Sequence, residues 1–222
     1  LHGGADKDNL AQEDLNALKQ GLPNLTRHIN NIKNVYHLPL CVAINKYTSD
    51  TENEIELIKN AVNKLGIQAV ECDVWGKGGM GATDLAKEVM NLCEKDNSKF
   101  CFCYNDEDSI ETKINKIAKN IYGANKVNFT PQALSDLELI NKLGYNSYPV
   151  IIAKTQYSFS DNQKLLGAPK DFEITIKELQ IRSGAKFIVA IAGSMLLMPG
   201  LPKIPAGAKM KIDDNNTISG LF

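Results

Sequence analysis

The spacing of apolar residues near the start of the chain is helical. Between residues 10 and 33, leucine and isoleucine recur mostly every three or four positions, the pattern of an amphipathic helix. The sequence Gly21-Leu22-Pro23 interrupts this pattern, and proline lacks the backbone N–H that a helix interior needs. We therefore predict two helical pieces with a break between them.

Two short apolar runs and two further helical stripes follow. Residues 39–44 form a continuous apolar run, typical of a strand buried on both faces of a parallel sheet, and residues 67–72 are predicted to form a second strand. Between them, Thr51 and Glu54 form a capping box before an apolar stripe, and residues 82–93 carry another stripe. This alternation predicts parallel pairing with right-handed crossovers, and it places the loops after both strands at one sheet edge.

The pattern changes after the polar stretch 94–99, and we place a candidate domain boundary between residues 97 and 108. Residues 100–104 could form a strand, and an apolar stripe over residues 110–121 predicts a helix that ends at Gly123. Thr130-Pro131 supplies the N-cap and first residue of a further helix, which runs to a glycine at position 144.

The last third of the chain is rich in strand patterns. Residues 149–153 and 187–192 are continuous apolar runs, and residues 172–176 alternate between apolar and polar positions. Residues 198–205 are irregular and proline-rich, and a hairpin is expected around residues 213–216. The predicted fold is an α/β unit over residues 1–104, followed by a smaller α+β domain over residues 105–222.

Composition narrows the class of protein. The chain of 222 residues has a net charge of −1, with basic and acidic residues interspersed, which argues against nucleic acid or an anionic membrane as the main partner. No apolar run approaches the roughly 20 residues that span a bilayer. Five cysteines, an odd number, fit reduced thiols in a cytoplasmic protein. The chain starts at Leu1 without methionine, and we expect it to be part of a longer polypeptide.

The first candidate site is the glycine-dense stretch over residues 74–81. Trp75, the only tryptophan, offers a flat apolar face, and glycines such as Gly78 let a ligand approach the backbone closely. A turn between a strand and a helix N-terminus is also where α/β folds bind ligands and anions. Glycine-rich turns are common, however, and a lone tryptophan is more often a core or edge anchor. Lys77 is followed by glycine, so this is not a Walker A loop.

Other polar residues carry weaker signals. His28 and His37 have no metal-ligand partner at i+4, so a surface or capping role is favoured for both. A metal site at Cys101-Phe102-Cys103 is not expected, because no second pair or histidine lies nearby. The polar stretch 154–161 could line a site, although a solvated loop is favoured.

Many short motifs, in this order, give the chain a close resemblance to the C-terminal part of the formate–tetrahydrofolate ligase family, also called formyltetrahydrofolate synthetase. The resemblance covers essentially the whole chain. The motifs include His2-Gly3-Gly4, Gly21-Leu22-Pro23-Asn24-Leu25, Val42-Ala43-Ile44-Asn45-Lys46, Ile121-Tyr122-Gly123-Ala124, Ala153-Lys154-Thr155-Gln156-Tyr157-Ser158, Leu165-Leu166-Gly167-Ala168-Pro169, Met198-Pro199-Gly200-Leu201-Pro202 and Gly220-Leu221-Phe222.

The resemblance implies an activity and partners. The family joins formate to tetrahydrofolate with ATP through formyl phosphate, giving 10-formyltetrahydrofolate, with Mg²⁺ and a monovalent cation, K⁺ or NH₄⁺. Its members are typically homotetramers, and their P-loop lies in the N-terminal half, so the early α/β unit would complete a P-loop NTPase-like domain. We expect the isolated chain to lack synthetase activity. The alternative is a non-catalytic folate-binding or assembly module.

The resemblance also implies site residues. Trp75 matches the family tryptophan that stacks on the pterin ring, and Tyr47 matches an aromatic, commonly phenylalanine, on its opposite face. Gly76 stands where alanine is expected, a change that should loosen the turn slightly. The rest of the turn completes the folate site, the segment after Leu166 resembles the part that approaches adenine, and the motif at 154–157 has no assigned role. The implied site residues are Tyr47, Trp75, Gly76, Lys77, Gly78 and Gly79 for folate and Gly167, Ala168 and Pro169 for the nucleotide.

Overall fold

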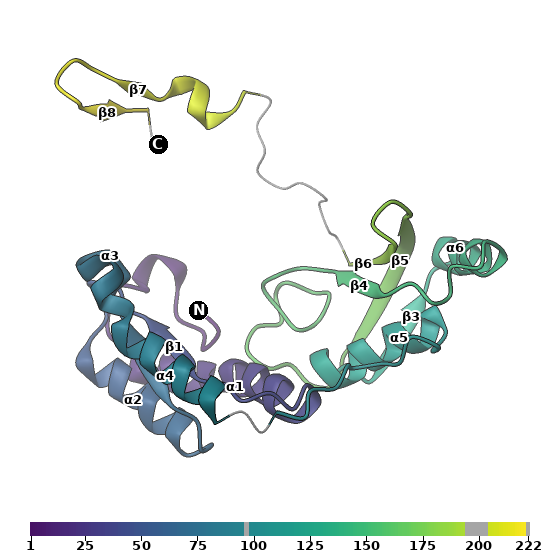
Figure 1. The fold of residues 1–222 in the computed structure, drawn as a ribbon, viewed down its shortest axis with the longest axis horizontal. Helices are drawn as coiled ribbons and strands as arrows, with labels where there is room; N and C mark the ends of the chain where they lie inside the picture. Colours follow the sequence, from purple (N-terminus) through teal and green to yellow (C-terminus); the bar gives the residue numbers. More distant parts are fainter. Residues whose placement is uncertain (96–97, 194–203, 221–222) are drawn as a thin grey trace.

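The computed structural model describes residues 1–95, 98–193 and 204–220 (Figure 1). We refer to residues 1–95 as the N-terminal unit and to residues 98–193 as the C-terminal unit. The N-terminal unit alternates helices and strands around a small two-stranded sheet. In chain order its elements are η1 (Lys7–Asn9), α1 (Leu15–Asn30), η2 (Asn31–Val35), β1 (Val42–Asn45), α2 (Glu52–Asn63), β2 (Ala69–Cys72), α3 (Val74–Lys77), η3 (Gly78–Ala82) and α4 (Thr83–Glu94).

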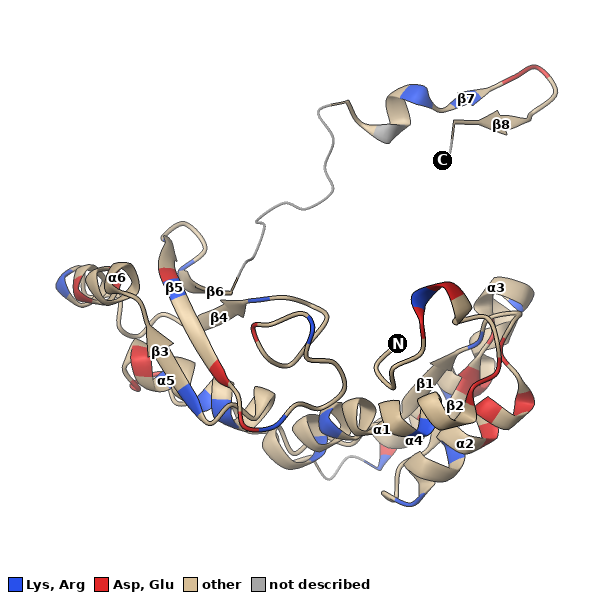
Figure 2. Cartoon of the chain, turned by 180° about the vertical axis from the view of Figure 1, so that it is seen from behind, with Lys and Arg blue, Asp and Glu red and all other residues tan. Residues whose placement is uncertain are grey.

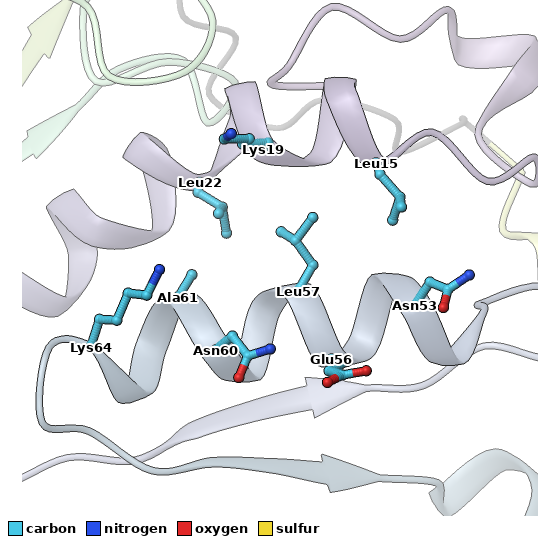
Figure 3. Close-up of a pocket in the computed structure, with 9 residues that line it drawn as sticks. All are labelled: Leu15, Lys19, Leu22, Asn53, Glu56, Leu57, Asn60, Ala61 and Lys64. Atoms are coloured by element: carbon cyan, nitrogen blue, oxygen red, sulfur yellow. The ribbon is translucent and has the colours of Figure 1, made fainter.

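The expected break in the first helix is wrong, because α1 is one continuous helix with Pro23 inside it. Asp14 caps its start by accepting a hydrogen bond of 2.8 Å from the backbone N–H of Ala17. Packing against α2 offsets the hydrogen bond that proline removes, a case of tertiary contacts overriding local propensity. Figure 3 shows Leu22 and Leu57 facing each other across the groove between α1 and α2.

The parallel pairing of the first two strands is confirmed. β1 and β2 pair in register from Val42 opposite Ala69 to Asn45 opposite Cys72. The expectation that the first strand is buried on both faces is wrong: Ile44 is buried, whereas Ala43 and Asn45 are exposed. Among the described residues this sheet has only two strands. Val42 and Ile44, on one face of β1, pack in the core cluster of this unit, whereas the face of Ala43 and Asn45 stays exposed.

The C-terminal unit is a mixed four-stranded sheet against which α5 and α6 pack. The strand order is β3-β5-β6-β4, with β5 and β6 antiparallel and the two outer strands parallel to their neighbours. Ser109 and Thr130 cap the two helices, as the sequence predicts for Thr130. The elements are α5 (Ile110–Ile117), η4 (Ala118–Tyr122), β3 (Lys126–Phe129), α6 (Pro131–Lys142), β4 (Val150–Ala153), β5 (Glu173–Arg182) and β6 (Phe187–Ala192).

Two expectations for this unit need correction, and one strand was not predicted. Residues 100–104 form no strand; the side chains of Phe100 and Phe102 pack edge to face and remain exposed. Lys126–Phe129, which the sequence analysis left unassigned, forms strand β3. The run at 149–153 is not wholly buried, because β4 is an edge strand and Ile151 is 52% exposed.

The two units meet along α1 and the turn that follows it (Figure 1). The side-chain amide of Asn24 donates to the carbonyl oxygen of Gly167 at 2.8 Å, and that of Asn31 donates to the carbonyl oxygen of Ile121 at 2.9 Å. His28 packs its ring at 4.7 Å from that of Phe159. These positions share one helical stripe, so α1 gives its apolar face to the N-terminal unit and a polar face to the C-terminal unit.

Residues 204–220 contain a short helical turn, η5 (Ala206–Lys209), and the predicted hairpin, formed by β7 (Lys211–Ile212) and β8 (Ile218–Ser219). Residues 198–203 of the proline-rich stretch lie outside the described residues. Figure 2 shows acidic and basic residues scattered over both units. Within the described ranges, no helix combines the length and apolar character needed to cross a membrane.

Candidate functional site

The carboxyl ends of β1 and β2 bring the two predicted aromatic residues to one sheet edge. Asn45 and Cys72 are register partners at the ends of these strands; Tyr47 follows two residues after the first, and Trp75 three residues after the second. Tyr47 is 66% exposed and Trp75 is 87% exposed. Two exposed aromatic side chains that follow the ends of adjacent parallel strands are typical of a binding surface.

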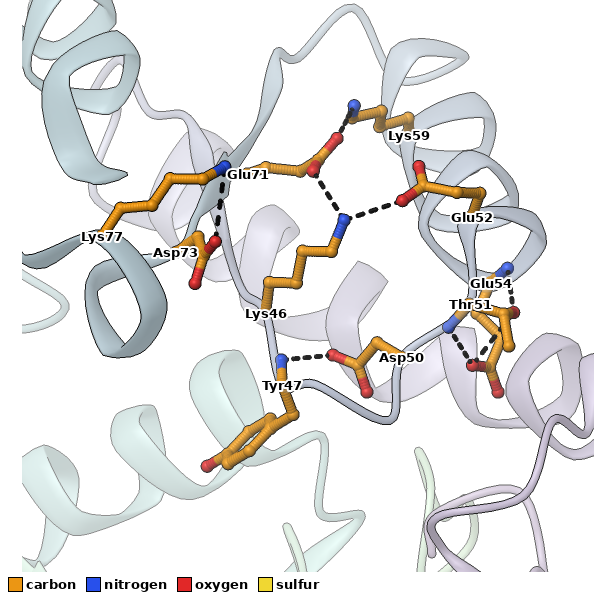
Figure 4. Close-up of polar contacts among 10 residues, drawn as sticks. All are labelled: Lys46, Tyr47, Asp50, Thr51, Glu52, Glu54, Lys59, Glu71, Asp73 and Lys77. Carbon is orange, nitrogen blue, oxygen red and sulfur yellow. Dashed lines mark hydrogen bonds and ion pairs between the residues drawn. The ribbon is translucent and has the colours of Figure 1, made fainter. Parts of the chain in front are cut away.

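Polar contacts fix the loop that carries Tyr47 (Figure 4). The Lys46 ammonium lies 2.8 Å from the Glu52 carboxylate and 3.4 Å from that of Glu71, and the hydrogen bond to Glu52 is the main reason that the pKa of Lys46 is raised. The backbone N–H of Tyr47 donates to Asp50 at 2.8 Å. Lys46 is therefore occupied by two carboxylates, and the backbone below the Tyr47 ring is held in place.

The predicted turn around Trp75 is helical in the structure. α3 and η3 follow β2 directly, and Asp73 caps α3 by accepting a hydrogen bond of 3.0 Å from the N–H of Gly76. Lys77 lies 3.4 Å from the same carboxylate. Asp73 thus occupies the N–H of Gly76, at a helix N-terminus where the sequence analysis expected an anion to bind, and it also pairs with the Lys77 ammonium.

The glycines of this stretch differ in whether the backbone structure requires a glycine at their position. Gly78 has φ of +57°, a conformation that other residues rarely adopt, and a Cβ at Gly81 would clash with the backbone carbonyl of Asp73. A Cβ at Gly76 would lie 2.8 Å from the Asp73 carboxylate, whereas one at Gly79 would meet nothing within 4 Å. Gly78 and Gly81 therefore shape the backbone beside Trp75, and Gly79 is not required for that shape.

The segment expected near adenine lies on the other unit. Gly167, in the loop between β4 and β5, has φ of +72° and donates its N–H to the Nδ1 of His2 at 3.1 Å. Its carbonyl accepts from Asn24 of α1. Two hydrogen bonds therefore join Gly167 to the α1 side of the N-terminal unit. Sequence spacing could not reveal His2 and Asn24 as partners, because each lies more than 140 positions from Gly167.

The polar stretch at 154–161 is an organised loop, so the preference for a solvated loop is wrong for its second half. The Lys154 ammonium donates to the carbonyl oxygens of Thr155 and Ser160 at 3.1 Å each and to that of Ser158, and it lies 4.7 Å from the Tyr122 ring centre. Burial lowers the pKa of Lys154 to about 8. Ser158 and Ser160 are buried and hydrogen-bond to each other, so this lysine fixes the loop from within.

The described residues contain no group of three or more histidine, cysteine, aspartate and glutamate side chains that could hold a metal ion. The carboxylates nearest the Trp75 edge are instead committed to lysines, as for Glu71 and Asp73. This donor set does not fit a Mg²⁺ site, so no chemical step is assigned to a metal here.

Fold and site together define an α/β protein that presents paired aromatic faces at the carboxyl edge of a parallel strand pair, a place where such folds bind flat ligands. The sequence matches the family described as formate–tetrahydrofolate ligase over residues 1–222. The chain therefore belongs to the formate–tetrahydrofolate ligase family, whose membership implies a ligase of one-carbon metabolism that uses ATP and tetrahydrofolate.

Proposed function

We propose that this chain is the C-terminal portion of an enzyme that joins formate to tetrahydrofolate through formyl phosphate, and that it binds the pterin ring at the Trp75 edge. The observation that carries the proposal is the pair of exposed rings, Tyr47 and Trp75, beyond adjacent parallel strands. By analogy with base stacking, each ring contact contributes about 1–3 kcal/mol. A two-sided clamp would supply a substantial part of the roughly 8 kcal/mol of micromolar binding.

The remaining folate contacts would come from the backbone at Gly76, Gly78 and Gly79, with the Lys77 side chain at the rim. Lys77 is 69% exposed and its ion pair with Asp73 lies at the surface, so a substrate carboxylate could compete for it at little cost. Gly79 has open space where a Cβ would stand, which leaves room for close approach of a ligand.

Gly167, Ala168 and Pro169 are proposed to approach the adenine of ATP. Gly167 is buried and held by His2 and Asn24, so the segment would be preorganised before the nucleotide arrives. Mg²⁺ and the monovalent cation, K⁺ or NH₄⁺, are proposed to bind outside the residues described here, with the phosphate-binding loop.

An N-terminal P-loop half is the proposed partner. The 222 residues contain no G-x-x-x-x-G-K-[ST] sequence, and a sheet of two strands is too small to stand as a complete nucleotide-binding core. β1 exposes one face, which further strands and helices would cover. We propose that the joined halves form a cytoplasmic homotetramer, and that the chain alone makes no 10-formyltetrahydrofolate.

Trp75 supplies the test, because it is the only tryptophan. Tetrahydrofolate should quench its fluorescence saturably, with free tryptophan as the control for ligand absorbance. Calorimetry should find binding weakened about 5- to 150-fold by Trp75→Leu, the loss of one stacking contact. Tyr47→Phe keeps the second ring and should bind normally, whereas Tyr47→Leu should weaken binding. If Trp75→Leu binds as tightly as the unchanged chain, with or without the N-terminal half, the folate site is elsewhere.

A coupled assay tests whether synthetase activity requires the N-terminal half. We expect no ATP-dependent product from the chain alone and recovery of activity when the N-terminal half is added. Product from the chain alone would refute the need for a partner half. Folate binding without recovery would instead favour the alternative, a non-catalytic folate-binding or assembly module, for which the absence of a Walker A sequence in these residues is the supporting observation.

A further inference from the structure

A hollow lies where the two units meet, and its lining does not include Trp75 or Tyr47. It has a volume of about 320 Å³ and lies between α1 and the loop that follows β4. Polar side chains reach it from three parts of the chain: His2 from the N-terminal segment, Asn24 and His28 from α1, and Lys154 and Gln156 from the loop. Phe159, Tyr122 and Ile152 supply its apolar wall.

The lining has basic groups and no acidic one. No aspartate or glutamate lines the hollow, while two imidazoles and one ammonium do. Asp161 is the carboxylate that acts on Lys154, and one of its oxygens already accepts from the N–H of Thr175 at 2.9 Å. Lys154 makes no ion pair within the described residues, so its positive charge is only partly compensated.

Both imidazoles have ring nitrogens that can donate to a ligand. The Nδ1 of His2 accepts from the N–H of Gly167, so the neutral ring carries its proton on Nε2 and can donate from there. His28 packs its ring against Phe159, and within the described residues its ring nitrogens have no hydrogen-bond partner. Asn24 uses one amide hydrogen for the carbonyl of Gly167 and has a second to give.

The electrostatic environment of the two histidines favours binding of an anion. Partial burial lowers the pKa of His28, and the charges of His2 and Lys154 lower it further; burial also lowers the pKa of His2. Both rings are therefore mostly neutral at pH 7. An anion placed among them would relieve the repulsion, raise both pKa values and draw protons onto the rings.

We propose that this hollow is an anion subsite for a phosphate-class oxyanion, held by the His28 ring, the Nε2 of His2 and the amides of Asn24 and Gln156. Donors from separate elements that line one hollow suit a tetrahedral group with several acceptor oxygens, and the Lys154 ammonium, which donates to three carbonyl oxygens of the loop, adds positive charge. Gly167 shares His2 and Asn24 with the subsite. The anion could be a phosphate of the nucleotide proposed to lie at Gly167–Pro169, or a free phosphate.

The test uses the three histidines of the chain, of which His37 lies outside the hollow and serves as an internal control. The ring pKa values of the whole chain would be measured by NMR titration with and without saturating inorganic phosphate. We expect phosphate to raise the pKa of His28 by about one unit and that of His2 in the same direction, with His37 unchanged. Equal movement of all three rings, or no movement of His28, would overturn the proposal.

Two further ligands separate the sources of the phosphate. Adenosine, which has no phosphate, should leave the pKa of His28 unchanged. If ATP raises it at a concentration at least tenfold below that of inorganic phosphate, the anion is the nucleotide's; if inorganic phosphate is as effective, it is free phosphate. Only the ATP arm rests on the proposed function. Tetrahydrofolate quenching of Trp75 fails or succeeds separately, so the two proposals can be told apart.

A matched pair of variants completes the test. His28→Phe keeps the ring contact with Phe159 and removes both nitrogens, so it should weaken phosphate binding, followed at His2, at least tenfold. His37→Asn is the control, because asparagine tolerates the φ of +52° at that position, and it should bind phosphate normally. Circular dichroism would establish that both variants fold. A folded His28→Phe variant with unchanged phosphate affinity would refute the assignment.

Discussion

The two units differ in how much apolar surface they bury. Within the described residues, the N-terminal unit has a core cluster of six buried side chains around Ile55 and Val62, whereas that of the C-terminal unit has eighteen, around Ile140, Ile174 and Ile188. The first has two paired strands and the second has four. The N-terminal unit therefore has less hydrophobic stabilisation of its own.

Two pairs of aromatic side chains differ in the same direction. Trp75 and Tyr47 of the N-terminal unit are exposed, whereas Phe159 and Phe172 of the C-terminal unit are 5% and 6% exposed. Phe159 and Phe172 therefore stabilise the core of the C-terminal unit, whereas Tyr47 and Trp75 contribute little to a core; Phe100 and Phe102 of the C-terminal unit are also exposed. The comparison suggests that the C-terminal unit acts as a scaffold for the polar face of α1, while the N-terminal unit has surface left for partners.

Core truncation should have the largest effect and should reveal whether the units unfold separately. Ile140→Ala and Ile55→Ala each remove a side chain that is at most 2% exposed, at a cost of about 2–5 kcal/mol. We expect two thermal transitions in calorimetry, the first from the N-terminal unit. Ile55→Ala should shift only the earlier transition and Ile140→Ala only the later one. A single transition that both variants shift equally would mean that the contacts along α1 make the units one cooperative body.

Lys113 gives a smaller effect that is specific to the C-terminal unit. Its side chain is wholly buried in α5, and its ammonium donates to the carbonyl oxygens of Asn146 at 2.9 Å and Tyr148 at 3.0 Å. Lys113→Met keeps the apolar stem but leaves two carbonyls without a donor. Relief from burying a charge offsets part of that loss, so we expect about 2 kcal/mol of destabilisation by urea unfolding.

The same helix offers a matched control for Lys113. Lys116 forms a partly exposed ion pair of 2.6 Å with Asp108. Lys116→Met should cost about 0–1 kcal/mol, because exposed ion pairs contribute little. Equal effects of the two substitutions would show that the buried ammonium contributes no more than the surface pair.

Lys113 also marks the limit of sequence-based prediction. Local signals were sufficient for Thr51 and Thr130, because the residues that complete a helix cap are neighbours in the chain. The partners of Lys113 lie 33 and 35 positions away, and no periodicity distinguishes it from a lysine on a solvated face. Pro23 misled for a related reason, since packing against α2 holds the helix through it.

The candidate sites divide in the same way. Strand–helix alternation was enough to place Tyr47 and Trp75 at one edge, because parallel strands end together. It could not indicate that Asp73 caps the helix after it and pairs with Lys77, since that depends on the helical geometry of α3. The hollow at His28 could not be predicted from the sequence. Its lining residues come from the N-terminal segment, from α1 and from residues 122–159, which meet only in the folded chain.

Lys154, in the C-terminal unit, should make the unfolding free energy depend on pH in the alkaline range. Its pKa is lowered from 10.5 to about 8 by burial, so the folded state releases its proton at lower pH than the unfolded state does. The unfolded state then holds more protons between about pH 8 and 10.5, and this group makes stability rise with pH across that window. The unfolding free energy of the unchanged chain minus that of Lys154→Met should therefore increase from pH 7 to pH 10. A constant or shrinking difference would contradict the lowered pKa.

Trp75→Leu should have the smallest effect on stability and makes the sharpest test of the comparison. With 87% of the side chain exposed, little apolar surface is lost from the fold, and the unfolding free energy should change by less than about 0.5 kcal/mol. Phe159→Leu, at a ring that is 5% exposed and packs on His28, should cost at least about 1 kcal/mol in the same urea experiment. A large loss of unfolding free energy in Trp75→Leu would mean that the ring stabilises the N-terminal unit itself. Its exposure could then no longer be attributed to a role in ligand binding.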